Sequence, residues 1–159
     1  MALLTDTEIA DELAIRDLAQ RFTDAVNRRS PTEMAALFAP DGRWIVPGVD
    51  ETVGHDDIAA RLTGLLGQFT HLVQLLHSGV VDLHGDRATA RWYLTEHGRD
   101  PEGAGALFIG YYEDDLERHD GAWRFASRTF AFLYRGRDEV PGRTYPYAGR
   151  DAAPAPPAG

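Results

Sequence analysis

Residues 106–134 read ALFIGYYEDDLERHDGAWRFASRTFAFLY, and they contain the clearest structural signal in the chain. Two runs rich in aromatic residues flank His119-Asp120-Gly121, and an Asp-Gly pair between such runs is typical of a hairpin. Two further runs, over residues 72–83 and 87–97, flank a second turn at His84-Gly85-Asp86. The second half of the chain is therefore predicted to form a four-stranded antiparallel meander.

The first half of the chain carries helical periodicity instead. Apolar residues recur three to five positions apart over residues 5–29, which predicts a first helix. A second helix is predicted to begin at Pro31, with Ser30 and Glu33 as a capping box. Residues 39–42, Ala-Pro-Asp-Gly, predict its end and a turn. The remaining predicted elements are a short strand over 43–46 and a third helix over about 56–69.

Helices gathered on one face of an antiparallel sheet make an α+β domain. We expect residues 1–135 to form one such domain, a cone-shaped barrel of curved antiparallel sheet with three N-terminal helices packed on it. The barrel is expected to surround one internal pocket. Residues 136–159 differ, because five prolines and few apolar residues leave this tail little to bury. Within the tail, Tyr145-Pro146-Tyr147 is the segment expected to pack back on the barrel.

Composition excludes several classes of function. The chain has 159 residues, the size of one domain, and its 16 basic and 25 acidic residues give a net charge of −9. Such a surface repels phosphate backbones, so no nucleic-acid partner is expected. The chain lacks cysteine, a signal peptide and a run of about 20 apolar residues, so we predict a cytoplasmic protein without a membrane contact. No metal site and no cofactor are predicted, because the histidines form no i, i+4 pair and no phosphate-binding glycine loop occurs.

Several short motifs resemble, in order and spacing, those of SnoaL-like proteins of the nuclear-transport-factor-2-like superfamily. They run from the first helix to the last strand: Ile15-Arg-Asp-Leu-Ala-Gln-Arg-Phe-Thr-Asp-Ala-Val-Asn-Arg-Arg29, Ala36-Leu-Phe-Ala-Pro-Asp-Gly42, His77-Ser-Gly79, Gly85-Asp-Arg-Ala-Thr-Ala-Arg91, Gly110-Tyr-Tyr-Glu-Asp114 and Asp120-Gly-Ala-Trp-Arg-Phe125. Within the superfamily, the similar enzymes are scytalone dehydratase and hexachlorocyclohexane dehydrochlorinase. The resemblance implies the fold described above, lyase-type chemistry and a homo-oligomer, either a dimer or a trimer.

The resemblance also implies a catalytic pair. In both enzyme families, a histidine on the first long strand pairs with an aspartate near the end of the first helix and removes a proton. By this resemblance His77 matches the histidine, whereas Asn27 stands in place of the aspartate. A neutral amide orients an imidazole but raises its basicity less than a carboxylate does. His97 matches a second histidine of the dehydratase, and Val26 and Val46 stand where that enzyme has two assisting tyrosines.

Strand alternation bears on the same residues. It places His77 on the mostly apolar face of its strand, where an imidazole is either a general base or a hydrogen-bonded core residue. On the next strand, alternation places Glu96 on the apolar face, whereas the resemblance favours His97. A bulge near Gly98 would reconcile the two, because one extra residue reverses the facing of a strand. Both residues therefore remain candidates.

Other candidate residues surround the expected pocket. Tyr112 is placed either to donate a hydrogen bond to a substrate oxygen or to pack in the core. Arg128 is either a cation for a developing oxyanion or half of an ion pair with Asp114 or Glu96. Asp24 is an alternative carboxylate or a solvated helix charge. The residues expected to supply apolar wall are Trp44, Phe69, Trp92 and Phe108.

The predicted function is that of a cofactor-independent lyase or isomerase acting on a hydrophobic, oxygenated small molecule. His77 would be the general base, Asn27 would orient it or cap the helix, and Glu96 or His97 would handle the leaving or receiving oxygen. One alternative is a non-catalytic small-molecule-binding or oligomerisation module. Another is a sheet whose outer face serves purely as a protein interface.

Overall fold

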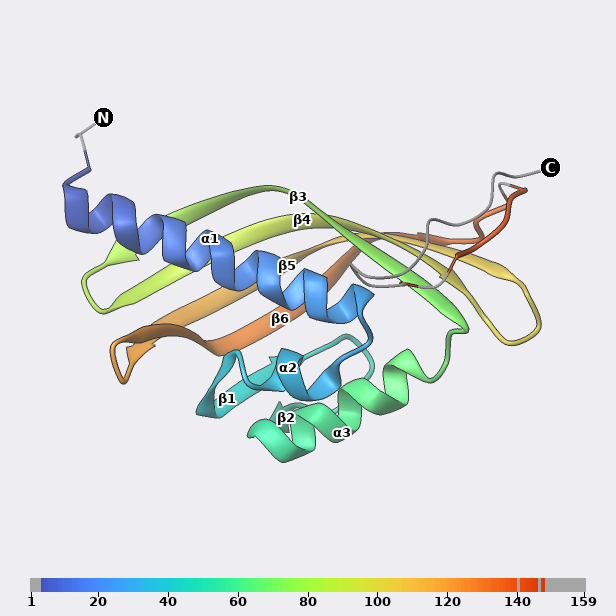
Figure 1. Ribbon diagram of the computed structural model, residues 1–159, viewed down its shortest axis with the longest axis horizontal. Coiled ribbons are helices and arrows are strands. Elements are labelled where there is room, and N and C mark those ends of the chain that lie inside the picture. Colours follow the sequence, from blue (N-terminus) through green and yellow to red (C-terminus); the bar gives the residue numbers. More distant parts are fainter. Residues whose placement is uncertain (1–3, 140, 146, 148–159) are drawn as a thin grey trace.

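The computed structural model describes residues 4–139, 141–145 and 147. Figure 1 shows long curved strands with helices packed against them. The helices are α1 (Asp6–Asn27), α2 (Pro31–Ala35) and α3 (His55–Leu66). The strands are β1 (Phe38–Ile45), β2 (Thr52–Val53), β3 (His71–His84), β4 (Arg87–Arg99), β5 (Gly105–His119) and β6 (Ala122–Gly136). The predicted α+β class is confirmed.

The strands form one sheet in the order β2-β1-β6-β5-β4-β3. Strands β3 to β6 are antiparallel neighbours, which confirms the predicted meander. Strand β1 pairs in parallel with β6 and antiparallel with β2, so the sheet is mixed rather than wholly antiparallel. The sheet curves around the core but stays open, because β2 and β3 lie at opposite ends of the strand order.

The helices differ from the prediction at their ends. Thr5 and Glu8 form a capping box at the start of α1. Ser30 makes no side-chain cap, and α2 ends at Ala35. Phe38, predicted to be helical, is the first residue of β1, since it pairs with Phe125 in the sheet and is buried. Helix α3 ends at Leu66, ahead of the predicted end.

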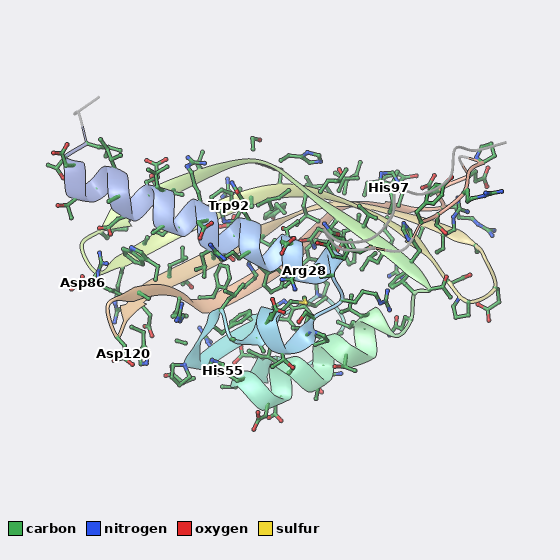
Figure 2. The ribbon with its side chains drawn as sticks, viewed as in Figure 1. Arg28, His55, Asp86, Trp92, His97 and Asp120 are labelled. Atoms are coloured by element: carbon green, nitrogen blue, oxygen red, sulfur yellow. The ribbon has the colours of Figure 1, made fainter. Side chains whose placement is uncertain are left out.

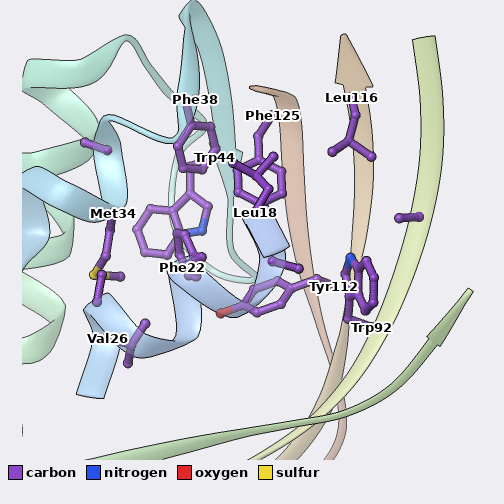
Figure 3. Packing of buried hydrophobic residues seen from close by; sticks show 14 of the residues in the cluster. Leu18, Phe22, Val26, Met34, Phe38, Trp44, Trp92, Tyr112, Leu116 and Phe125 are labelled. Atoms are coloured by element: carbon purple, nitrogen blue, oxygen red, sulfur yellow. The ribbon is translucent and has the colours of Figure 1, made fainter. Parts of the chain in front are cut away.

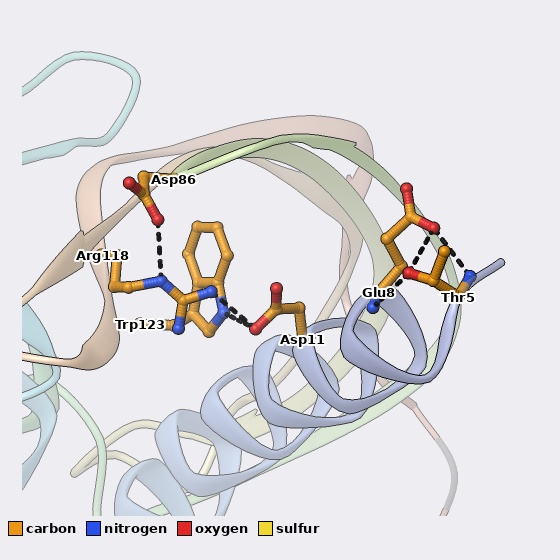
Figure 4. Close-up of polar contacts among 6 residues, drawn as sticks. All are labelled: Thr5, Glu8, Asp11, Asp86, Arg118 and Trp123. Carbon is orange, nitrogen blue, oxygen red and sulfur yellow. Dashed lines mark hydrogen bonds and ion pairs between the residues drawn. The ribbon is translucent and has the colours of Figure 1, made fainter.

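A polar cluster fastens the start of α1 to the β5–β6 hairpin (Figure 4). Arg118 donates hydrogen bonds to the carboxylates of Asp11 at 2.7 Å and Asp86 at 3.0 Å. The indole N–H of Trp123 also donates to Asp11, at 3.1 Å. Arg118 and Trp123 together hold the pKa of Asp11 below its usual value by stabilising the carboxylate. These contacts fix α1 across the sheet.

One apolar core fills the space between α1 and the sheet, and Figure 3 shows its packing. The ring of Phe22 meets those of Phe38, Tyr112 and Phe125 edge-on, with ring centres 6.2, 5.8 and 6.0 Å away. Phe22 also lines a pocket toward the C-terminal end of α1. It therefore separates the closely packed core from the open space described below.

Strand β3 contains a bulge that changes which side chains face the core. Leu76 pairs with Leu94 and Gly79 with Trp92, so β3 uses one residue more than β4 over this step. Gly79, Val81 and Leu83 face inward, but before the bulge the inward positions are Leu72, Gln74 and Leu76. The predicted inward facing of His77 is therefore wrong.

We expect Gly79→Ala to destabilise the fold. A Cβ atom at this position would lie 2.1 Å from Cε3 of Trp92 and 2.8 Å from the carbonyl oxygen of Arg91. Because the strand or the indole must shift, the free energy of unfolding should fall by about 1–3 kcal/mol. Gly64→Ala is the matched control, because a Cβ there meets nothing within 4 Å in a helix, and it should stabilise by about 1 kcal/mol. Urea unfolding of both variants checks this, and equal midpoints would contradict it.

Little of the predicted tail lies within the described part of the chain. Strand β6 continues to Gly136, and Tyr145 and Tyr147 are exposed. Pro146 lies outside the described residues, as do residues 148–159, so the prediction about their packing stands untested. Among the described residues, no helix combines the length and apolar composition needed to cross a membrane.

Candidate functional site

An apolar pocket of about 310 Å³ lies between the C-terminal half of α1, helix α3 and the sheet. Its walls are mainly aliphatic and aromatic, from Phe22, Val26, Met34, Trp44, Leu62, Leu66, Phe69, Phe108 and Phe130, among others. Besides Trp44, five of the described lining residues carry polar side-chain atoms: Gln68, Gln74, Glu96, Tyr112 and Arg135. A mostly apolar cavity with a few convergent polar groups is typical of a small-molecule site.

Gln74 is the centre of a buried hydrogen-bond network in this pocket. Its Nε2 donates to Oε1 of Glu96 at 2.8 Å and to the hydroxyl of Tyr112 at 3.0 Å. Its Oε1 accepts from the hydroxyl of Thr23 at 2.9 Å. Both polar atoms of the amide are therefore hydrogen-bonded. These bonds fix the Gln74 side chain and, through it, the positions of Glu96 and Tyr112.

Asn27 holds the backbone of the same residue. Its Nδ2 donates to the Gln74 carbonyl at 2.9 Å, and its Oδ1 accepts from the Gln74 N–H at 2.8 Å. An amide offers both an N–H donor and an oxygen acceptor, which matches these two backbone groups, whereas a carboxylate offers acceptors alone. Asn27 thus positions β3 against the end of α1 and is not bonded to His77.

Asn27→Asp should destabilise the protein by about 1–3 kcal/mol at neutral pH, because a carboxylate oxygen would face the Gln74 carbonyl without a proton between them. That carbonyl should raise the pKa of the new aspartate, so stability is retained at low pH and lost as the pH rises through the raised value. Urea unfolding at acid and neutral pH measures this effect. Asp24→Asn, one turn earlier on the exposed side of α1, is the control, and equal losses in both variants would contradict the assignment.

Among the described residues, Glu96 is the one carboxyl group that lines the pocket. Burial raises its pKa above the usual 4.5, and the hydrogen bond from Gln74 offsets part of the rise. That bond goes to Oε1, and among the described residues Oε2 has no hydrogen-bond partner. Glu96 therefore has a raised pKa and one oxygen open to a ligand, two properties that suit an acid–base group.

Tyr112 supplies a hydroxyl beside this carboxyl. Its ring is buried against Phe22 and Phe130, and Figure 3 shows the hydroxyl pointing from β5 toward α1. The oxygen accepts from Gln74, and the described residues offer no acceptor for its proton. Burial and the charge of Glu96 raise the pKa of Tyr112, so the phenol stays protonated and can donate a hydrogen bond.

The indole N–H of Trp44, also on the pocket wall, is buried without an acceptor in the described chain.

His77 does not face the pocket, and the prediction that it does is wrong. Its side chain is exposed on the outer side of β3, where Nε2 lies 2.7 Å from the hydroxyl oxygen of Thr95. The cause is the bulge between Leu76 and Gly79, which reverses the facing of the preceding residues. Gln74 takes the inward position opposite Asn27.

The structure also decides between Glu96 and His97. Strand β4 keeps its register through Gly98, so no bulge turns His97 inward. His97 Nδ1 instead lies 2.9 Å from Oδ2 of Asp138, and Figure 2 shows His97 among the strands, away from α3. Asp24 is exposed and bonded to Arg28 at 2.7 Å, so it is outside the site as well.

Arg128 lies in the core beside the pocket and not on its wall. Its guanidinium donates to both oxygens of Asp114, at 2.8 and 2.7 Å, and both side chains are fully buried. The guanidinium carbon also lies 4.1 Å from the ring centre of Tyr112. Trp92 donates to the same carboxylate at 2.9 Å and belongs to this cluster rather than to the pocket wall. Of the alternatives for Arg128, the structural ion pair with Asp114 is the one observed.

The predicted apolar wall is otherwise in place, since Trp44, Phe69 and Phe108 all line the pocket. Sequence reasoning missed Gln74 and Arg135. Alternation restarted on both sides of the bulge would have placed Gln74 inward, but no sequence signal marked Arg135. Within the described residues, no group of three or more His, Asp or Glu side chains is arranged to hold a metal ion.

Comparisons with known proteins agree with this architecture. The chain is 24% identical over 131 residues to gamma-hexachlorocyclohexane dehydrochlorinase of Sphingobium indicum, covering 79% of this chain and 83% of that protein. It superposes on a type 2 hexachlorocyclohexane dehydrochlorinase (LinA) with a TM-score of 0.80 at 18% identity, covering 87% and 96% of the two chains. A Novosphingobium aromaticivorans protein, provisionally assigned as a scytalone dehydratase, gives a TM-score of 0.77 at 22% identity over 89% and 100%.

At these identities, the solved structures establish the fold and leave the reaction open. The family comparison goes further, because the SnoaL-like domain model matches residues 7–129, which include nearly all of α1, all of α3 and every residue of the Gln74 network. This chain therefore belongs to the SnoaL-like domain family.

Proposed function

We propose that the chain is a cofactor-independent lyase or isomerase that moves a proton on a hydrophobic, oxygenated small molecule, with Glu96 as the proton-transfer group. The observation that carries the proposal is the state of Glu96. It is a carboxyl with a raised pKa in an apolar pocket, held by Gln74 at one oxygen and open at the other. The dehydrochlorinase named among the relatives supports elimination as one form of this chemistry.

The chemistry follows from the two groups bonded to Gln74. Oε2 of Glu96 takes a proton from a carbon next to a carbonyl, and the electron pair of the broken C–H bond moves into the carbonyl to form an enolate. The hydroxyl of Tyr112 donates a hydrogen bond to that oxygen as charge develops. Returning the proton to another carbon gives an isomer, whereas loss of a leaving group from the β-carbon gives an elimination product.

A fixed geometry supports this assignment. Glu96 and Tyr112 accept hydrogen bonds from the same nitrogen, at 2.8 and 3.0 Å, so the base and the donor lie side by side in the pocket. Asn27 and Thr23 in turn fix Gln74. Positioning of this kind is a large part of enzymatic rate enhancement.

A non-catalytic binding module is the second candidate, and one observation favours it. Asn27 stands where the resemblance implies an aspartate, and its side chain holds the backbone of Gln74 rather than an imidazole. In this alternative, Glu96 would stay protonated and donate a hydrogen bond to a bound ligand.

Solvent exchange separates the two candidates. The protein is incubated in deuterated buffer with a panel of hydrophobic ketones, and deuterium at the carbon next to the carbonyl is measured by mass spectrometry. We expect exchange above the buffer rate that increases with pH as Glu96 ionises. A ketone that binds in the pocket but exchanges no faster than in buffer would refute the enzyme and favour the binding module.

A homo-oligomer also remains our expectation. The outer face of the β3–β6 meander exposes large apolar side chains, namely Leu75, Val80, Tyr93, Ile109 and Tyr134. Exposed apolar surface of this kind supports association between copies of the chain. Light scattering after size-exclusion chromatography tests this, and a monomer at all concentrations would contradict it.

A further inference from the structure

Of the pocket-lining residues in the described part of the chain, Arg135 is the one that carries a positive charge. Its side chain is exposed, which places it at the mouth of the pocket. It is the residue before Gly136, the last residue of β6. The guanidinium carbon lies 5.9 Å from the ring centre of Phe108 and 5.7 Å from that of Phe132. Both rings line the same pocket, so the cation is held over its apolar wall.

Within the described part of the chain, the guanidinium group of Arg135 forms no ion pair and no hydrogen bond, and its contacts are with aromatic rings. Several other arginines, such as Arg28, Arg91 and Arg118, bind one or two carboxylates. In a chain with a net charge of −9, carboxylates outnumber cations. An arginine left with open donors at a pocket mouth is therefore available to an anion from outside.

The sheet register relates Arg135 to the proposed base. Glu96 pairs with Phe108 on β5, and Phe108 pairs with Arg135 on β6, so the three residues form one row across three strands. Two strand spacings separate Glu96 from Arg135, about 10 Å between their backbones. The two charges form no ion pair with each other, and Phe108 is the residue between them in this row. A ligand seated over Phe108 would thus face a carboxyl group on one side and a guanidinium on the other.

A second, more open hollow of about 540 Å³ adjoins the pocket and shares Phe69, Phe108 and Arg135 with it. Arg137 lines only this outer hollow. Arg135 therefore stands at the junction between the apolar pocket and a region open to solvent. A charged head group placed there would keep part of its hydration while an apolar body fills the pocket.

From these observations we infer that the ligand of the pocket is an apolar monocarboxylate, whose carboxylate group is bound by Arg135 at the mouth. This inference rests on the proposed function for the reacting end of the ligand, which faces Glu96. The bidentate fork of a guanidinium matches a carboxylate, and the apolar lining matches an aromatic or alicyclic body.

Binding measurements test the inference with 2-naphthylacetate and its neutral amide, 2-(2-naphthyl)acetamide, by calorimetry. We expect the wild-type protein to bind the acid about tenfold more tightly than the amide. Arg135→Gln should abolish that preference by weakening the acid alone. Arg137→Gln, which removes the same charge from the outer hollow, is the matched control and should leave most of the preference intact.

The inference would be overturned if the wild type showed no preference for the acid, if both variants lost the same affinity, or if the acid did not bind up to millimolar concentration. Equal losses would indicate a general electrostatic field rather than a seat at Arg135. Glu96→Gln separates this inference from the proposed function, because it should abolish proton exchange yet keep the preference for the acid. If Glu96→Gln instead tightens acid binding and Arg135→Gln does not weaken it, the carboxylate binds at the Glu96 end of the pocket, and the inference is wrong.

Discussion

Replacing Glu96 with glutamine should lower the rate of solvent exchange into a bound ketone by about a hundredfold to ten-thousandfold, the usual effect of losing a general base. The ligand Kd should change little, because glutamine has the same shape and its carbonyl oxygen can still accept the hydrogen bond from Gln74. The expected signature is thus a loss in kcat with KM nearly constant.

The same variant should be more stable than the wild type at neutral pH. Burial raises the pKa of Glu96, so the folded protein retains the proton at pH values where the unfolded chain has already released it. The favourable contribution is complete below the usual value of 4.5 and is lost as the pH rises through the folded pKa. Glu96→Gln removes this loss, and urea unfolding across the pH range measures it.

Glu113→Gln is the matched control for both effects. Glu113 is an exposed carboxylate on the outer face of β5, paired with Arg91 at 2.6 Å. Its replacement should leave the exchange rate unchanged and the stability within about 1 kcal/mol of wild type. If Glu96→Gln retained wild-type exchange, Glu96 would not be the base.

Asp114→Ala should cause the largest loss of stability, about 3–5 kcal/mol. Arg128 and Asp114 are both fully buried, and the substitution leaves the guanidinium without its counter-charge. Burial raises the pKa of Asp114 and Arg128 opposes the rise, so the carboxylate depends on this partner. Trp92 loses its acceptor as well. Guanidinium chloride unfolding measures the change.

Two further variants separate the buried charge from general damage to the strand. Glu113→Ala, at the preceding residue of β5, removes an exposed ion pair and should cost less than about 1 kcal/mol. The double variant Asp114→Leu and Arg128→Met removes both buried charges and should recover most of the stability lost in Asp114→Ala. If the double variant were as unstable as the single one, burial of an unpaired charge would not be the cause.

The sequence predicted the meander well, because strand periodicity and two Gly-containing turns are local signals. Strand β1 was harder to predict. Its first residues follow a short helix and contain Pro40 and Gly42, and only parallel pairing with β6, far along the chain, makes them a strand. Tertiary pairing of this kind has no local signature.

The candidate site was predicted in part. Alternation on β4 placed Glu96 inward correctly, because that strand keeps its register. The same argument failed on β3, because the bulge before Gly79 reverses the side to which the preceding residues point. Gln74 therefore faces the pocket, and His77 faces outward. Asn27 was expected to orient an imidazole, whereas it clamps the backbone of Gln74. Arg135 could not be foreseen, since its place at the pocket mouth depends on how β6 curves past Phe108.

The most direct test of the role of Glu96 is a carbon-13 NMR titration of its side-chain carboxyl, with Glu96→Gln used to identify the resonance. We expect a midpoint above the usual 4.5, because the carboxyl is buried in an apolar pocket. We also expect the pH dependence of the exchange rate to follow the same midpoint. A midpoint at or below 4.5, or an exchange rate whose pH dependence does not follow the Glu96 midpoint, would show that Glu96 is not the base.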